Sequence, residues 1–152
     1  MDTHFTKLNE DWNADPNAPM PVAARAGGDL WLRFCPNEWL NPSHLARGHL
    51  FIRFAGCQRF RFTSINDHGW FGGQCRFSKV APAWGEFYEV DGDFIESLDE
   101  TPWTIISARS DLARNFLFYF RDEAFECTAS SWSLSTECSS GSIFEEAVCH
   151  VQ

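Results

Sequence analysis

The chain has 152 residues, a formal net charge of −9 and a hydrophobic content of 44%. This length predicts one domain, and the acidic balance argues against general affinity for nucleic acids, because phosphates attract basic protein surfaces. The 15 phenylalanines and 7 tryptophans predict a core that is largely aromatic.

The first 28 residues predict an extended lead-in to a single domain over residues 29–152. Pro16, Pro19 and Pro21 lie close together, and Gly27-Gly28 ends the stretch. The N-terminal residues lack the basic and apolar regions of a signal peptide, and no apolar run approaches the roughly 20 residues that a membrane helix needs. We therefore expect a cytoplasmic protein that does not contact a membrane.

Short segments of alternating apolar and polar residues dominate the rest of the chain. They predict strands, separated by turn residues, over 29–35, 49–54, 58–64, 73–78, 86–91, 103–108, 115–120 and 124–131. Short helices are expected over 93–96 and 142–145, and a loop over the serine-rich residues 130–142. The pattern is typical of a mainly β protein, an antiparallel β-sandwich or small barrel, with an α+β fold as the alternative.

Arginine alternates with phenylalanine in the middle of the chain. Successive side chains of a strand point to opposite faces, so Arg59 and Arg61 are expected on one face and the phenylalanines between them on the other. Arg76 continues this alternation in the next predicted strand. Such a cationic face needs a partner, which is an internal carboxylate, an anionic ligand or another protein.

Charges are segregated along the chain. Residues 33–79 contain seven Lys or Arg and two acids, whereas residues 80–100 contain seven acids and no base. Because like charges facing each other across a sheet destabilise it, we predict that at least two arginines of the cationic row pair inside the molecule. The row comprises Arg53, Arg59, Arg61 and Arg76, and the expected carboxylates are Glu86, Glu89 and Asp91.

The glycine-rich segment 66–74 is the first candidate site. It carries Asp67, His68 and Trp70, which a turn can present together at the mouth of a pocket. The alternative is a wide hairpin turn in which Asp67 caps the backbone and Trp70 packs as a lid. A hydrolase-type site can also be assembled, with His68 as general base, Asp67 or Glu86 orienting it, and the arginines holding an anionic substrate.

The second candidate site is the turn 81–86, which is followed by the acidic segment 86–100. Trp84 lies between a proline and a glycine, where it serves either as a platform for a ligand or as a cover for the end of the core. Glu86 and Tyr88 begin an acidic segment in which aromatic residues alternate with carboxylates. Interfaces favour aromatic anchors ringed by charge, so this segment is expected to contact a partner.

The residues 115–131 predict a β-hairpin. Its phenylalanines at 116, 118 and 120 are expected on one face, with Leu117, Tyr119 and also Phe125 on the other. Apolar residues on both faces indicate a central strand that is covered on two sides.

The six cysteines are widely spaced and form no C-x-x-C pair. Without an export signal they are expected to be reduced and mostly buried. The sequence contains no nucleotide-binding, zinc-protease or nucleophile-elbow motif, and its histidines lack the spacing of metal ligands. We expect no cofactor and no metal.

Together these features favour a non-enzymatic protein-binding or regulatory module. One form is an inhibitor or immunity-type protein whose acidic aromatic surface covers a basic partner, because complementary charge speeds association. The alternatives are a β-barrel that binds a small anionic ligand and the hydrolase-type enzyme. No catalytic residue is assigned, and the residues assigned to ligand or partner binding are Arg59, Arg61, Asp67, His68, Trp70, Arg76, Trp84, Glu86 and Tyr88.

Overall fold

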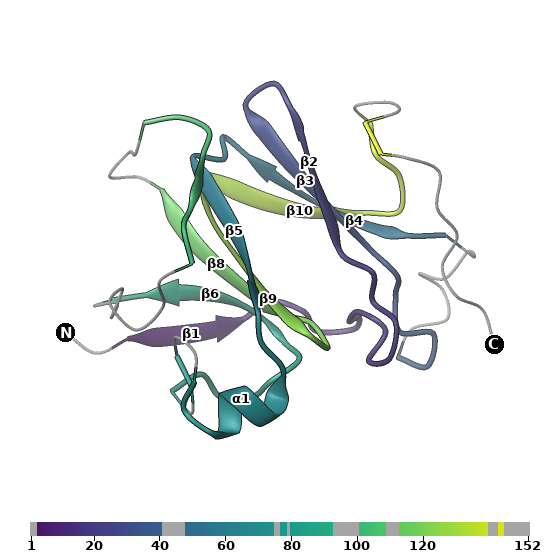
Figure 1. The fold of residues 1–152 in the computed structure, drawn as a ribbon. Helices are drawn as coiled ribbons and strands as arrows, with labels where there is room; N and C mark the ends of the chain where they lie inside the picture. Colours follow the sequence, from purple (N-terminus) through teal and green to yellow (C-terminus); the bar gives the residue numbers. More distant parts are fainter. Residues whose placement is uncertain are drawn as a thin grey trace.

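The computed structural model describes residues 3–40, 48–74, 77–78, 80–92, 101–108, 113–139 and 143–144. Two antiparallel sheets pack against each other around a common core (Figure 1). This arrangement confirms the expected mainly β sandwich, and the sheets do not close into a barrel. No helix in the described part of the chain is long and apolar enough to cross a membrane.

The larger sheet has six strands and the smaller sheet has four, and all neighbouring strands run antiparallel. In spatial order the larger sheet consists of β1 (His4–Lys7), β6 (Phe87–Asp91), β8 (Arg114–Tyr119), β9 (Glu123–Ala129), β5 (Arg59–Ser64) and β7 (Thr104–Ile105). The smaller sheet consists of β10 (Ser131–Ser135), β4 (Leu50–Ala55), β3 (Asp29–Phe34) and β2 (Val22–Ala26).

The lead-in belongs to both sheets. Its β1 pairs with β6 at one edge of the larger sheet, and its β2 pairs with β3 at one edge of the smaller sheet. Between these strands, Trp12 is buried and stacks on Phe34 with ring centroids 5.9 Å apart. The lead-in is therefore fixed to the body of the molecule, although its prolines indicated only an extended chain.

The core between the sheets is aromatic, as the composition indicated. Its phenylalanines are fully or almost fully buried, and their rings meet edge-on, tilted or, for Phe87 and Phe116, stacked with centroids 6.1 Å apart. They include Phe34, Phe54, Phe87, Phe116, Phe118 and Phe125. The inward residues come from every second position, Phe116 and Phe118 in β8 and Phe125 and Cys127 in β9, which is the alternation that the sequence showed.

The larger sheet is also covered on its outer face. Leu117 and Tyr119 of β8 lie there in a second cluster with Trp70 and Tyr88, so β8 is buried on both sides as predicted. The assignment of Phe125 to this face is wrong. Phe125 pairs directly with Phe118 across β8 and β9, and cross-strand partners share a face.

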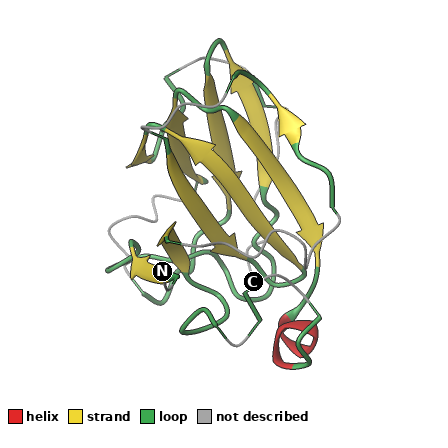
Figure 2. Ribbon diagram, turned by 90° about the vertical axis from the view of Figure 1, so that its left-hand side faces the viewer, coloured by secondary structure: helices red, strands yellow, loops and turns green. Residues whose placement is uncertain are grey.

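Two elements differ from the expectation. The segment 66–74 contains a short helix, α1 (Asp67–Phe71), because the Asn66 side chain accepts a hydrogen bond from the Gly69 backbone N–H at 3.0 Å and caps the first turn. This helix lies beyond the ends of the long strands (Figure 2). The serine-rich residues expected to form a loop contain β10, which pairs with β4 along its whole length.

One predicted strand does not form in the residues described, and two predicted helices lie wholly or partly outside them. The described residues of the predicted strand 73–78 form turns. The predicted helix 93–96 lies outside the described residues, and of the predicted helix 142–145 only residues 143–144 are described, neither of them helical.

The cysteines are not all reduced. Cys35 is disulfide-bonded, so the expectation of free thiols is wrong for this residue. Cys57 and Cys127 are free thiols buried in the core between the sheets, and Cys138 is a free, half-exposed thiol. A small buried thiol behaves as an apolar side chain, which explains why both fit among the phenylalanines.

Candidate functional site

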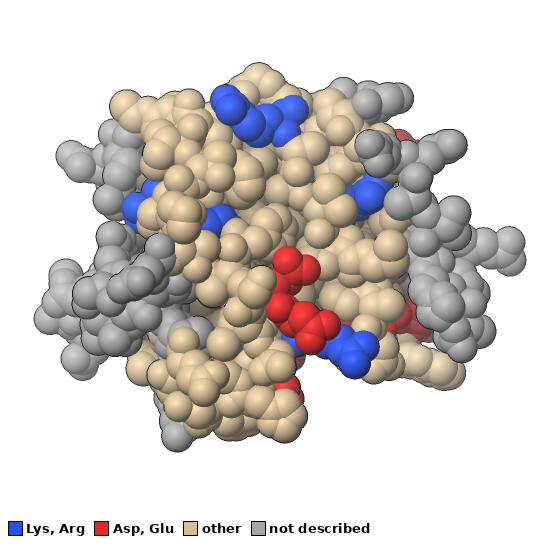
Figure 3. Space-filling view, viewed as in Figure 1, with Lys and Arg blue, Asp and Glu red and all other residues tan. Residues whose placement is uncertain are grey.

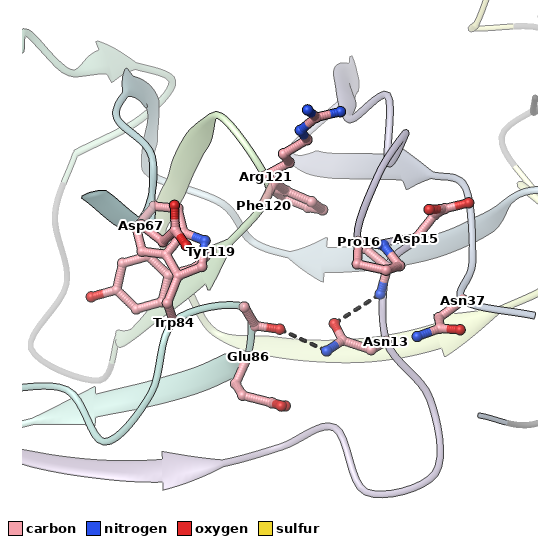
Figure 4. Close-up of a pocket in the computed structure, with 12 residues that line it drawn as sticks. Asn13, Asp15, Pro16, Asn37, Asp67, Trp84, Glu86, Tyr119, Phe120 and Arg121 are labelled. Atoms are coloured by element: carbon pink, nitrogen blue, oxygen red, sulfur yellow. Dashed lines mark hydrogen bonds between the residues drawn. The ribbon is translucent and has the colours of Figure 1, made fainter. Parts of the chain in front are cut away.

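A cleft of about 440 Å³ has Asp67, the first residue of α1, in its lining, so it lies at the end of the sandwich where α1 is found. We call it the end cleft. Five segments that are distant in the sequence line it: residues 13–16 of the lead-in, Asn37 after β3, Asp67 at the start of α1, residues 84–86, and residues 119–121. Figure 4 shows Trp84 and Tyr119 together on one side of the cleft and Asp15 and Asn37 on the other.

Two aromatic rings form one wall of the end cleft. The ring of Trp84 packs on that of Tyr119 with centroids 4.6 Å apart and an angle of 31° between the ring planes. Behind them, Trp70 of α1 contacts Tyr119 edge-on at 6.5 Å. Trp84 is only half-buried, so it presents part of its surface to the cleft while Trp70 supports Tyr119 from the core.

Tyr88 positions the loop that carries Trp84. Its hydroxyl donates to the Ala83 carbonyl at 3.2 Å and accepts from the Ala83 backbone N–H at 3.1 Å. Burial raises the pKa of Tyr88 above its ordinary value, so the hydroxyl stays protonated at neutral pH. Tyr88 therefore contributes to the site indirectly, by fixing its aromatic wall.

Three carboxylates line the end cleft. One oxygen of Asp15 accepts from the backbone N–H groups of Asn17 and Ala18, at 2.8 and 3.2 Å, and one oxygen of Asp67 accepts from the His68 backbone N–H at 2.9 Å. Within the described part of the chain, the second oxygen of each accepts no hydrogen bond from the protein. Both aspartates can therefore still bind a donor.

Of the three carboxylates, Glu86 alone contacts other side chains within the described residues. It accepts a hydrogen bond from Asn9 at 2.6 Å and lies 3.4 Å from the ammonium group of Lys7. Asn9 also accepts the backbone N–H of Phe87 and donates to the Trp12 carbonyl, so this network ties the lead-in to β6. The Glu86 charge is thus offset within the protein.

Two asparagines on the lead-in side have different roles. Asn13 donates to the Gly85 carbonyl at 2.6 Å and accepts the Ala14 backbone N–H at 2.8 Å, as the dashed lines of Figure 4 show. It holds the cleft together. The Asn37 oxygen accepts the Trp39 backbone N–H at 3.0 Å, whereas its Nδ2 donates to no group in the described residues and remains available at the cleft wall.

The charge of the end cleft is acidic. Asp15, Asp67 and Glu86 face a single basic side chain, Arg121, which donates to the Asn17 carbonyl at 2.8 Å. Figure 3 shows acidic side chains gathered in the lower middle of one face of the molecule, with basic side chains beside them. A cationic ligand is therefore better suited to the cleft than an anionic one.

The arginines of β5 lie elsewhere, on the outer face of the larger sheet. Both are buried, and their guanidinium carbons lie 3.9 Å (Arg59) and 4.2 Å (Arg61) from the centroid of the Trp103 ring. Arg61 donates to Glu126 of β9 at 2.8 Å, and Arg59 donates to Thr128 at 3.1 Å. These contacts make the two arginines part of the packing of this face.

The prediction that arginines of the cationic row pair internally is confirmed. Arg61 pairs with Glu126, and Arg53 pairs with Asp29 at 2.6 Å. The prediction of which carboxylates form these pairs is wrong. Glu89 forms a bidentate pair with Arg114 instead, and Glu86 contacts Lys7. The strand order explains this: β9 lies directly beside β5, whereas β6 is two strands further away.

The structure thus brings together three of the residues singled out from the sequence, Asp67, Trp84 and Glu86, with Trp70 and Tyr88 behind them. His68 is exposed on α1 and does not line the end cleft, so the hydrolase-type arrangement is not assembled there. Arg76 lies outside the described residues.

Sequence reasoning missed most of the residues that line the end cleft. Asp15, Asn37, Tyr119 and Arg121 were not singled out, because nothing in a single sequence shows that they converge. A signal did exist for the lead-in, since asparagine, aspartate and proline cluster over residues 13–17, as in functional turns.

Comparison with protein-family models, curated proteins and solved structures finds no match. Within the described residues, no group of three His, Cys, Asp or Glu side chains could hold a metal ion. The end cleft is therefore interpreted from its own chemistry.

Proposed function

We propose that this protein is a non-enzymatic binding module that recognises another protein through the end cleft. The observation that carries the proposal is the pairing of an aromatic wall, Trp84 on Tyr119, with aspartates that keep a free oxygen. Protein interfaces concentrate binding energy in such aromatic anchors and use surrounding charges for orientation.

The alternative of a small anionic ligand has less support. Three carboxylates against one arginine in the end cleft would repel an anion. The arginines expected to hold an anion, Arg59 and Arg61, are buried against Trp103 and bonded to Thr128 and Glu126. Their contacts support a structural role.

An inhibitor or immunity-type protein is the form of this function that the charge favours. A net charge of −9 and an acidic cleft would draw the molecule to a basic partner and align the two surfaces. We keep the cytoplasm as the proposed location. The disulfide at Cys35 is the observation that bears against it, because such bonds persist in oxidising compartments; fractionation of the native host decides between the two.

Affinity capture from a native host lysate, followed by chemical cross-linking, tests the proposal. The bait is the full chain, and the test variants are Trp84→Ala and Asp67→Asn. The control is Phe71→Ala, which removes an exposed ring of α1 that does not line the end cleft. Thermal unfolding establishes that each bait is folded.

We expect wild type and Phe71→Ala to retain the same protein, with cross-links at the cleft, and both cleft variants to lose it. Recovery of the bare monomer from the host lysate would contradict the proposal. Equal capture by the folded Trp84→Ala and Asp67→Asn baits would also contradict it, because binding would then occur elsewhere.

A further inference from the structure

A second hollow lies beside the end cleft. This side hollow has a volume of about 260 Å³ and is lined by residues 15–18 and 37–39. It shares Asp15, Pro16 and Asn37 with the end cleft, so the two hollows lie on either side of these residues. We call these two adjacent hollows the groove; an extended chain that crosses the shared residues can occupy both of them.

The groove is acidic along its whole length. Asp15 and Glu38 line the side hollow, which contains no basic residue, and Asp67 adds a further charge in the end cleft. The two remaining charges there are already compensated: Glu86 by Lys7, and Arg121 by a carbonyl and by Asp122 at 3.8 Å. The carboxylates at 15, 38 and 67 therefore remain for a cationic group.

Trp39 provides an apolar anchor at the far end of the groove. Its side chain is 91% exposed, and the adjacent Leu40 is 55% exposed. A turn holds Trp39 in this exposed position. The Asn37 side chain accepts a hydrogen bond from the Trp39 backbone N–H at 3.0 Å, and the Asn37 carbonyl accepts one from the Leu40 backbone N–H at 3.4 Å. A large aromatic ring held in water beside a hollow is typical of a binding hot spot.

The free polar groups of the groove match a peptide backbone with a basic side chain. Asp15 and Asp67 each offer a carboxylate oxygen to an ammonium or guanidinium group. Asn37 offers its Nδ2 as a donor, which a backbone carbonyl of an extended segment can accept. A neutral sugar would stack on Trp84 equally well but would leave the aspartates without a counter-charge.

We propose that the groove binds an extended segment of the partner protein that carries a lysine or arginine next to an apolar side chain. The basic side chain enters the end cleft between Asp15 and Asp67, and the apolar side chain covers Trp39. This inference rests on the proposed function and adds to it the chemistry of the partner.

Selection from a random dodecapeptide library displayed on phage tests the inference. The full chain is immobilised, and the double variant Asp15→Asn/Asp67→Asn is panned in parallel. The matched control is Glu10→Gln/Glu137→Gln, which removes the same charge from exposed positions that line neither hollow. Enriched sequences are then synthesised and titrated by calorimetry, together with versions in which the basic residue is replaced by norleucine.

We expect wild type and control to enrich peptides with a Lys or Arg beside an apolar residue. Norleucine should weaken binding at least tenfold, and affinity should fall as salt rises from about 50 to about 500 mM, because the aspartates and the cation are screened. Trp39→Ala should weaken binding at least tenfold while leaving its salt dependence unchanged, because the ring carries no charge.

Three results would overturn the inference. The first is that wild type enriches no peptides beyond those enriched by Asp15→Asn/Asp67→Asn. The second is that the enriched peptides lack a basic residue. The third is that a neutral oligosaccharide binds the wild type and still binds the double variant. If a captured host protein still depends on Trp84 in any of these cases, the proposed function stands and only the chemistry of the partner is wrong. Failure of the wild-type bait to capture any host protein would remove the proposed function as well.

Discussion

At the scale of single residues, two arginines form ion pairs that differ in burial. Arg61 and Arg53 belong to the same cationic row in the sequence, yet the Arg61 pair with Glu126 is buried, with side chains 3% and 7% exposed. The Arg53 pair with Asp29 lies at the surface, with exposures of 46% and 22%. Burial, not the type of pair, decides how much each contributes to stability.

Arg61→Gln should therefore lower the free energy of unfolding by about 3–5 kcal/mol, because it removes the guanidinium that pairs with the buried Glu126 carboxylate. Arg53→Gln is the matched control and should cost about 0–1 kcal/mol, since water replaces the lost contact. Urea denaturation of both variants measures the difference. A cost below about 1 kcal/mol for Arg61→Gln would show that Glu126 finds other support.

Glu123 gives a prediction about pH. Burial, and secondarily the charge of Asp122, raises the pKa of its carboxyl above the ordinary value of 4.5. Since the folded pKa exceeds the unfolded one, the stabilising contribution is present below pH 4.5 and is lost as the pH rises through the folded pKa. Glu123→Gln should thus make the protein more stable than wild type at neutral pH, with the difference vanishing in acid.

Thermal unfolding at several pH values checks this expectation. Asp122→Asn is the companion variant, and it should give a smaller gain, because it removes only the lesser cause of the shift. A Glu123→Gln protein that is less stable than wild type at neutral pH would mean that the carboxylate has a favourable partner.

At the scale of elements, the strands were predictable and the site was not. Alternation in β8 and β9 identified a central hairpin, because one residue in two must face the core. β10 was missed since its serines resemble a loop, and only pairing with β4 makes them a strand. The end cleft joins five distant segments, so Asp67 and Trp84 could be proposed separately but their convergence with Asp15 could not.

The central position of β8 leads to a prediction. Phe118 is fully buried and contacts Phe34, Phe87 and Phe120 with ring centroids 5.4, 5.1 and 4.3 Å apart. Phe118→Ala should cost about 3–5 kcal/mol, because the neighbouring rings cannot close the cavity. Phe71→Ala, which removes an exposed ring, is the control. Guanidinium denaturation measures both, and similar losses would contradict the central position of β8.

At the scale of the whole molecule, one six-stranded sheet separates two cores. Cys57 and Cys127 lie in the core between the sheets, where burial raises the pKa of the Cys127 thiol well above its ordinary range. A hydrogen bond with Cys127 lowers the pKa of Cys57, which nevertheless remains buried. Reagents therefore reach these thiols only when the two sheets separate.

Iodoacetamide at neutral pH without reductant should label Cys138 in the native protein and leave Cys57 and Cys127 unmodified. As guanidinium is added, labelling of the two buried thiols should follow global unfolding monitored by circular dichroism. Peptide mass spectrometry assigns each adduct. Labelling of either buried thiol in native buffer at the rate of Cys138 would show that the sheets open locally.

The exposed Trp39 is a natural fluorescence probe for ligand binding. Of the seven tryptophans, three are buried and three are half-buried, whereas Trp39 is 91% exposed beside Glu38. Collisional quenching of fluorescence should thus select Trp39. Relative to free tryptophan, its quenching by caesium should be enhanced and its quenching by iodide reduced, because the adjacent Glu38 carboxylate attracts cations and repels anions. A ligand in the side hollow would shield the ring and shift its emission to shorter wavelength, so occupancy can be followed in the unmodified protein without a label.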